Sequence, residues 1–251
     1  MRLLILALLT ATAAAEPATI RVFVALADNQ TQGILPVPAK IGNGNDAPNN
    51  LYWGCSDALP PVFKASGDWK LISTGKGGKD AVIERVTFLH KSGKWRMVAD
   101  AYRGAAIREC IGDFLAALGS EVPVAEFPLA AYIGHCGLME FSPPPESIAR
   151  RGTGRDAIVL CCKSRGYFAA HLEAVNARPR LLSTQLMYPG GFLLRAALDG
   201  WMLGESSGQI RQRAASAYAR NQTIPVKAAA GVFADLGGAR QTDEAGRPPG
   251  R

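Results

Sequence analysis

Two reactive side chains each follow a short apolar segment of this 251-residue chain. His135 comes directly after the segment 129–134, and Cys162 closes the segment 157–162. Both segments have the length and composition of buried β-strands. If these strands are parallel neighbours, their carboxyl ends bring an imidazole and a thiol to one edge of the sheet, where open α/β folds place their ligand sites. The pair therefore predicts a cysteine nucleophile with a histidine base.

An acyl-transfer reaction at such a thiol also needs donors for the negative charge of its intermediate. Backbone N–H groups commonly supply them, and we expect the N–H groups of Gly137 and of Cys162 itself to do so. A backbone carbonyl or a water molecule is enough to orient the imidazole, so no third residue is compulsory. We expect a peptide or protein substrate and no cofactor or metal.

The surrounding pattern predicts an α/β domain. Residues 20–28 form an apolar, partly β-branched strand, and a long polar loop begins at its carboxyl end. Residues 82–89 and 95–102 flank a turn and predict an antiparallel hairpin, and residues 105–118 have helical spacing. We therefore expect a three-layer α/β/α sandwich with a mostly parallel central sheet and a small antiparallel addition.

The remaining elements complete one predicted domain, residues 16–236. Short strands are expected at 69–73 and 180–185, and helices at 56–65, 146–151, 167–176, 191–203, 209–219 and 226–236. The stretch 137–156 is long enough for a minimal right-handed crossover between parallel strands. Residues 237–251, rich in Gly, Pro and charge, predict a disordered tail.

Residues 1–15 have the pattern of a signal peptide. A basic start is followed by the apolar stretch 3–9 and by small residues up to Ala15, which predicts a secreted or periplasmic protein. This stretch is too short to cross a bilayer, and no later segment is long and apolar enough, so we expect no stable membrane insertion. The formal charge of +7 is spread along the chain without a basic run, which argues against a nucleic-acid partner.

The order of these features resembles the caspase-like cysteine peptidases, the group of caspases, metacaspases, legumain, and the gingipain and clostripain types. The resemblance extends from Ile20 to Leu181 and rests on an apolar strand ending in His135 before a second strand ending in Cys162. It implies that these residues are the catalytic histidine and the nucleophile, on adjacent parallel strands. The chain departs from the family in having Cys136 where a glycine usually follows the histidine, and in a short interval between the two residues.

Four further residues are candidates for substrate binding. Asp28 ends the first strand and could bind a basic side chain of the substrate, and Asp100 is a second candidate acid. Each of these carboxylates could instead cap a loop or a helix. Ser183 and Thr184 follow the nucleophile's strand and could line the substrate cleft.

Two other interpretations of the cysteines remain open. His135, Cys136, Cys161 and Cys162 together offer the soft ligands that suit Zn²⁺ or Cu⁺, although neighbours in a strand point to opposite faces.

Alternatively, the chain is a secreted α/β binding domain without catalysis, in which a Cys136–Cys161 disulfide joins the strand ends. With five cysteines at least one thiol stays unpaired in the monomer, and Cys55 and Cys110 form another possible pair.

Overall fold

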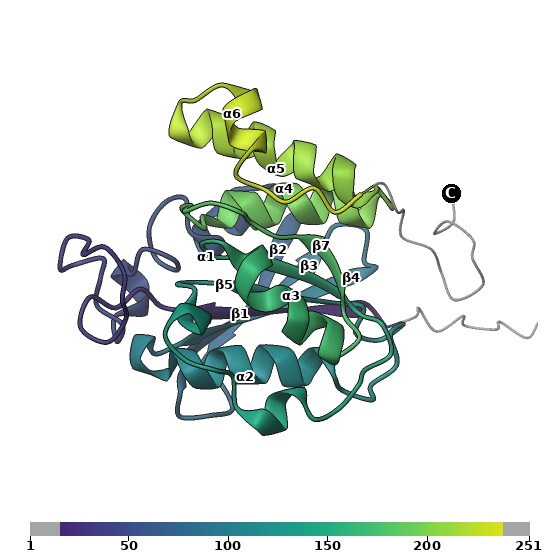
Figure 1. The fold of residues 1–251 in the computed structure, drawn as a ribbon, viewed down its shortest axis with the longest axis horizontal. Helices are drawn as coiled ribbons and strands as arrows, with labels where there is room; N and C mark the ends of the chain where they lie inside the picture. Colours follow the sequence, from purple (N-terminus) through teal and green to yellow (C-terminus); the bar gives the residue numbers. More distant parts are fainter. Residues whose placement is uncertain (1–15, 238–251) are drawn as a thin grey trace, which may run out of the picture.

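A computed structural model describes residues 16–237 of the chain. The predicted signal peptide, and all of the predicted tail except Gly237, lie outside the described residues. Within the described range the strands form one seven-stranded sheet (Figure 1). Its strands, in spatial order, are β2 (Trp69–Gly75), β3 (Val82–His90), β4 (Trp95–Tyr102), β1 (Ala18–Ala25), β5 (Leu129–Ile133), β6 (Asp156–Leu160) and β7 (Arg178–Leu181).

The sheet is parallel in its larger part and antiparallel at one side. Strand β1 is parallel to both β4 and β5, and β6 is parallel to β5 and β7. Strands β2 and β3 pair in antiparallel fashion with each other, and β3 pairs likewise with β4. The predicted α/β class, with a mostly parallel sheet and a small antiparallel addition, is therefore confirmed.

Helices cover both faces of the sheet (Figure 1). The helix α2 (Ile107–Leu118) and α3 (Ser164–Ala174) lie on one face. On the other face lie α1 (Leu59–Lys64), α4 (Gly191–Met202), α5 (Ser207–Gln222) and α6 (Val226–Ala230). Short 3-10 turns occupy Ala47–Asn49, Gly104–Ala106, Gly137–Met139 and Pro145–Ile148. No helix within residues 16–237 is both long and apolar enough to span a bilayer.

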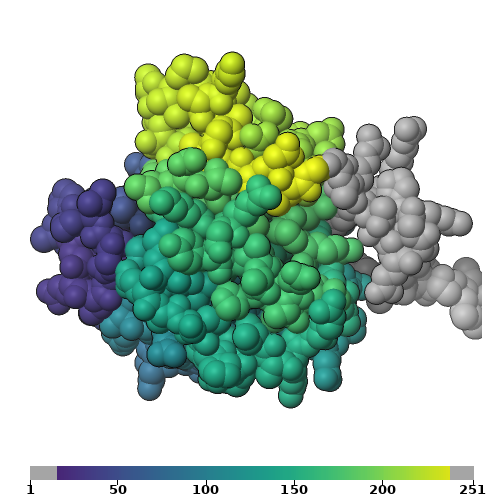
Figure 2. All heavy atoms as spheres, viewed as in Figure 1, coloured from purple at the N-terminus to yellow at the C-terminus, as the bar shows by residue number. Residues whose placement is uncertain are grey.

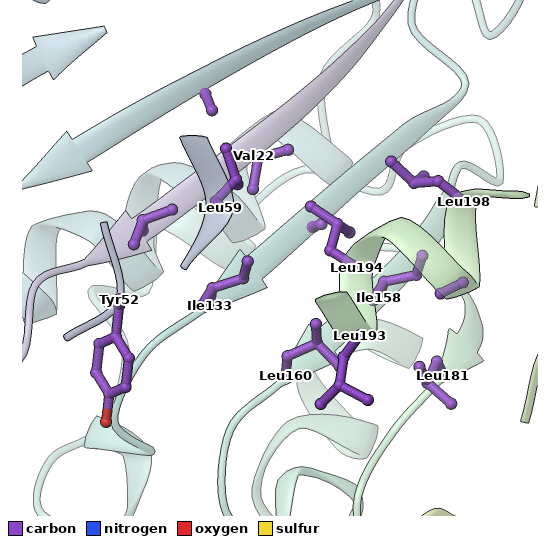
Figure 3. Packing of buried hydrophobic residues seen from close by; sticks show 14 of the residues in the cluster. Val22, Tyr52, Leu59, Ile133, Ile158, Leu160, Leu181, Leu193, Leu194 and Leu198 are labelled. Atoms are coloured by element: carbon purple, nitrogen blue, oxygen red, sulfur yellow. The ribbon is translucent and has the colours of Figure 1, made fainter. Parts of the chain in front are cut away.

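The central strands β1, β5 and β6 contribute side chains to two hydrophobic cores, because successive residues of a strand point to opposite faces. In β1, Val22 and Val24 belong to the core beneath α4, whereas Phe23 and Ala25 belong to the core beneath α2. Figure 3 shows the first core, where Leu193 and Leu194 of α4 lie over the strands. Strand β5 is apolar throughout because both of its faces are buried.

The structure differs from the predicted elements mainly near the chain end. The predicted helix 226–236 ends at Ala230, where Gly231 follows. The predicted strand 180–185 is instead Arg178–Leu181, because Ser183 turns away to form an isolated antiparallel bridge with Phe233. Between β5 and β6 the crossover contains 3-10 turns in place of the predicted helix 146–151.

A buried arginine fixes the start of β6. The Arg155 side chain is fully buried, and its guanidinium donates to the backbone carbonyls of the segment that connects α2 to β5. The accepting carbonyls are those of Leu118, Ser120, Val122 and Phe127. This one side chain therefore ties the entry of β6 to the entry of β5.

We expect Arg155→Met to lower the free energy of unfolding by about 3 kcal/mol, because the buried carbonyls lose a charged donor. Urea denaturation followed by circular dichroism measures this change. Arg151→Met is the matched control, since exposed Arg151 makes only long bonds of 3.3 and 3.4 Å. Equal midpoints for the two variants would contradict this role of Arg155.

Candidate functional site

The ends of β5 and β6 lie side by side, as the sequence predicts. Ile133 is paired with Leu160 in the parallel register, and the Gly134 N–H donates to the Leu160 carbonyl at 3.3 Å. Gly134 has a φ of +155°, and a Cβ there would lie 3.0 Å from the Ala25 carbonyl oxygen. Only glycine fits this bend comfortably. The chain can therefore turn at once after β5 and place His135 beyond the sheet edge.

His135 and Cys162 line one cavity of about 570 Å³. This volume lies in the range of pockets that bind small ligands. The long loop after β1 supplies one wall through Ile34, Val37 and Tyr52, and the segment after β7 supplies another. Figure 2 shows this loop as the purple lobe beside the C-terminal helices.

The Cys162 thiol is held by the backbone of Met187. The Met187 N–H donates to Cys162 Sγ at 3.4 Å, and Sγ lies 3.5 Å from the Met187 carbonyl oxygen. The next residue, Lys163, has φ 50° and ψ 32°, the left-handed region that non-glycine residues rarely adopt. This turn leads directly into α3. The half-buried thiol therefore sits at a sharp strand-to-helix turn with an N–H group directed at its sulfur.

A carboxylate orients His135. Its Nε2 lies 2.6 Å from Glu140 Oε1, and the same oxygen accepts the Gly33 N–H at 2.9 Å. The imidazole is nearly buried, with 9% of the side chain exposed. Because the carboxylate is a hydrogen-bond acceptor, Nε2 carries the hydrogen of this bond, and in that neutral tautomer the free lone pair is on Nδ1. Among the described residues, no group forms a hydrogen bond with Nδ1, so this nitrogen is free to act as a base.

No hydrogen bond joins His135 and Cys162 within residues 16–237. Each side chain has its own support: Glu140 for the imidazole and Met187 for the thiol. In a site without substrate the nucleophile and base are commonly further apart than in the working complex. The arrangement is that of two separately held groups that line a shared cavity.

Sequence reasoning missed Glu140 and Tyr52. Glu140 follows His135 by five residues, at the end of a 3-10 turn that folds back on the imidazole, and an acid shortly after a candidate base is the only signal of it. Tyr52 lines the cavity, and burial together with the neighbouring Cys162 and Cys161 thiols raises the pKa of its hydroxyl. Among the described residues, this hydroxyl has no hydrogen-bond partner.

The structure does not give Gly137 its predicted place. Its N–H donates to the His135 carbonyl at 3.0 Å, and the ring of Phe141 fills the space above its Cα. This N–H is therefore already used inside the turn and is unavailable for an oxyanion. The N–H of Cys162, the other predicted donor, forms no hydrogen bond with any described residue.

The two candidate acids lie outside the cavity. Asp28 is buried and accepts from the Gln30 N–H at 2.9 Å and the Thr31 hydroxyl at 2.8 Å, so it caps its own loop. Asp100 is buried in β4 and forms an ion pair with Arg85 whose atoms lie 2.5 Å apart. This bond raises the pKa of the Arg85 guanidinium. The alternative of capping or pairing is therefore the observed role of both carboxylates.

Ser183 and Thr184 also have structural roles away from the cavity. The buried Ser183 hydroxyl donates to the Cys161 carbonyl, and the Ser183 N–H donates to Ser164 Oγ at 2.8 Å. The Thr184 hydroxyl donates to the Gly231 carbonyl at 3.0 Å. The Ser183 bonds fasten the segment after β7 to the turn that carries Cys162, whereas Thr184 fastens it to the segment after α6. Neither residue lines the cavity.

The other cysteines are buried or remote. All five cysteines lie within residues 16–237 and have free thiols, so neither proposed disulfide is present. Burial and the adjacent Cys136 thiol raise the pKa of Cys161. Cys110 belongs to the core beneath α2, whereas Trp53 and Leu59, on either side of Cys55 in the sequence, pack in the core beneath α4. This sheet-wide separation prevents a Cys55–Cys110 bond.

The metal interpretation lacks a ligand set. Within residues 16–237 no three side chains of His, Cys, Asp or Glu gather in a way that could hold an ion. Cys136 and Cys161 are fully buried, and Cys162 Sγ points to the Met187 backbone.

Comparisons with protein-family models, curated proteins and solved structures found no match. What the site offers chemically is a thiol, a carboxylate-oriented imidazole and a hydroxyl around one cavity.

We expect Gly33→Ala to displace the Glu140 carboxylate, because a Cβ on Gly33 would overlap Glu140 Oε1. His135 would then lose its Nε2 partner while both site residues stay unchanged. The ¹H–¹⁵N NMR signals of the His135 ring report this loss through the Nε2–H resonance. Gly78→Ala is the control, because a Cβ there meets open space. An unaltered His135 spectrum in Gly33→Ala would refute this dependence.

Proposed function

We propose that this chain is a caspase-like cysteine endopeptidase in which Cys162 is the nucleophile and His135 the base. One observation carries the proposal: the paired ends of β5 and β6 direct an imidazole and a thiol into the same cavity. The order of the two residues along the chain, and their adjacent parallel strands, agree with what the resemblance to caspase-like peptidases implies. The sequence of residues 1–15 supports action in the periplasm or outside the cell.

The first step forms an acyl-enzyme. His135 Nδ1 takes the thiol proton, and the sulfur of Cys162 attacks the carbonyl carbon of the scissile peptide bond. The carbon–nitrogen bond then breaks, and the imidazolium returns its proton to the departing amine. The products of this step are a free amine and a thioester on Cys162.

The second step releases the acid. His135 Nδ1 takes a proton from water, whose oxygen attacks the thioester carbon. The carbon–sulfur bond breaks, and the proton restores the thiol. Glu140 stabilises the imidazolium that forms in each step through its 2.6 Å contact with Nε2.

The tetrahedral intermediate of each step carries an oxyanion that needs hydrogen-bond donors. The Cys162 N–H and the Tyr52 hydroxyl have no partner among the described residues, and both belong to residues that line the cavity. The pKa of Tyr52 is raised above its ordinary value by burial, so the phenol keeps its proton and remains a donor. We assign the role of oxyanion donor to these two groups. The Cys162 N–H keeps its predicted role, and the Tyr52 hydroxyl takes the place predicted for Gly137.

Labelling of the full chain with iodoacetamide, followed by peptide mass mapping, tests the nucleophile. We expect Cys162 to react first, because burial raises the pKa values of Cys55, Cys110 and Cys161 and so keeps these thiols protonated. His135→Ala should slow peptide turnover by about 100-fold. Cys55→Ala is the control and should leave labelling of Cys162 and turnover unchanged.

The proposal fails if Cys162 is not selectively modified, or if His135→Ala leaves labelling and turnover as they were. In that case the cavity belongs to a binding domain on the same scaffold. Circular dichroism of each variant separates loss of reactivity from loss of fold.

Tyr52→Phe tests the oxyanion donor. We expect kcat for a peptide to fall by about 100-fold, because one donor to the intermediate is lost. Alkylation of Cys162 by iodoacetamide creates no oxyanion, so its rate should stay the same. Tyr167→Phe, on the exposed side of α3, is the matched control. Equal kcat values for Tyr52→Phe and the unaltered chain would remove Tyr52 from the reaction.

A further inference from the structure

The cavity beside the dyad is lined mainly by apolar side chains. They come from three separate parts of the chain: the loop after β1, the turn after His135 and the segment after β7. The lining side chains of this kind are Ile34, Leu35, Val37, Met139, Leu186 and Met187. Such a wall favours an apolar ligand group, because burial of apolar surface is the main favourable term in binding.

No carboxylate, ammonium or guanidinium lines this cavity within the described part of the chain. Two carboxylates bond to lining residues without lining the cavity themselves. Glu140 is engaged by His135 Nε2 and the Gly33 N–H, and Asp57 accepts the Tyr188 hydroxyl at 2.9 Å. The Tyr218 hydroxyl in turn accepts the Tyr188 N–H at 3.2 Å. Tyr188 and Tyr218 are therefore engaged in hydrogen bonds and bring no charge to the wall. A charged substrate side chain would be desolvated there without a partner.

We infer that the peptide carries an apolar side chain, aliphatic or aromatic, on the residue whose carbonyl is attacked by Cys162. This inference rests on the proposed function and names its substrate class. It replaces the expectation of a basic side chain that Asp28 and Asp100 suggested, because both of these acids are bound elsewhere.

Two leucines extend the apolar wall to the protein surface. Leu35 and Leu186 line the cavity, and these residues are 84% and 64% exposed, respectively. Exposed large apolar side chains at the mouth of an apolar pocket mark a surface that a partner covers. The two leucines are far apart in the sequence: Leu35 lies in the loop after β1 and Leu186 in the segment after β7. A bound peptide would bury both leucines as its apolar side chain enters the cavity.

Peptidyl acyloxymethyl ketones that differ only in this one residue test the inference on the full chain. They react with an active cysteine nucleophile, and mass spectrometry identifies the labelled residue. We expect second-order rate constants for labelling of Cys162 to be at least ~10-fold higher with Leu, Phe or Met than with Asp, Lys or Arg.

Leu186→Asp places a carboxylate at the mouth of the cavity. We expect the rate ratio of the Arg probe to the Leu probe to rise roughly threefold, the effect of one exposed charge pair. Leu203→Asp is the matched control, because Leu203 is 70% exposed and lies outside the cavity. It should leave both rate constants unchanged.

The outcomes separate the inference from the proposed function. If no probe labels Cys162, the proposed function fails, and the inference fails with it. If Cys162 is labelled but a charged probe reacts as fast as the apolar ones, only the inference is overturned. Labelling led by Leu, Phe or Met, with the ratio shifted in Leu186→Asp and not in Leu203→Asp, supports both.

Discussion

The parallel pairing of β5 with β6 is the constraint on which the site depends. Its register places Ile133 beside Leu160, so both strands end at the same level of the sheet. A shift by one residue would exchange the faces of every side chain in the strand and move the thiol away from the imidazole's cavity. The apolar side chains of β5 and β6 fill both hydrophobic cores and thereby set the pairing. Reactive polar side chains of these two strands are therefore found at the strand ends.

Buried polar groups hold that register at the other end of the strands. Arg155 joins the entry of β6 to the segment before β5, and the adjacent Asp156 accepts the Trp201 indole N–H at 2.7 Å from α4. Burial raises the pKa of Asp156, although Trp201 and Arg178 act against that shift. A buried charge is stable only with such partners, so a displaced strand would leave several of these groups unsatisfied. The network thus penalises wrong registers more than it stabilises the right one.

The sequence was sufficient for the parts of the fold and site that depend on local pattern. The strands ending near His135 and Cys162, their parallel pairing and the antiparallel hairpin all follow from apolar runs, turns and crossover length. Glu140, Tyr52 and the Met187 backbone could not be predicted in this way, because only the folded loops bring them to the two strand ends. The same limit explains Asp28 and Asp100: a carboxylate near the correct sheet edge has no pattern that tells a binding group from a loop cap or an ion pair.

The site therefore combines two kinds of structure with different freedom. The reactive groups stand on strand ends fixed by packing, and the left-handed turn at Lys163 sets the thiol's direction at some cost in backbone strain. The cavity wall instead comes from the loop after β1 and from residues 186–188. Its members Leu35 and Leu186 belong to neither core, so their side chains can change without disturbing the packing. If the proposed function holds, the sheet sets the chemistry and these loops set the selectivity, so the preferred substrate side chain follows from the cavity wall and not from His135 and Cys162.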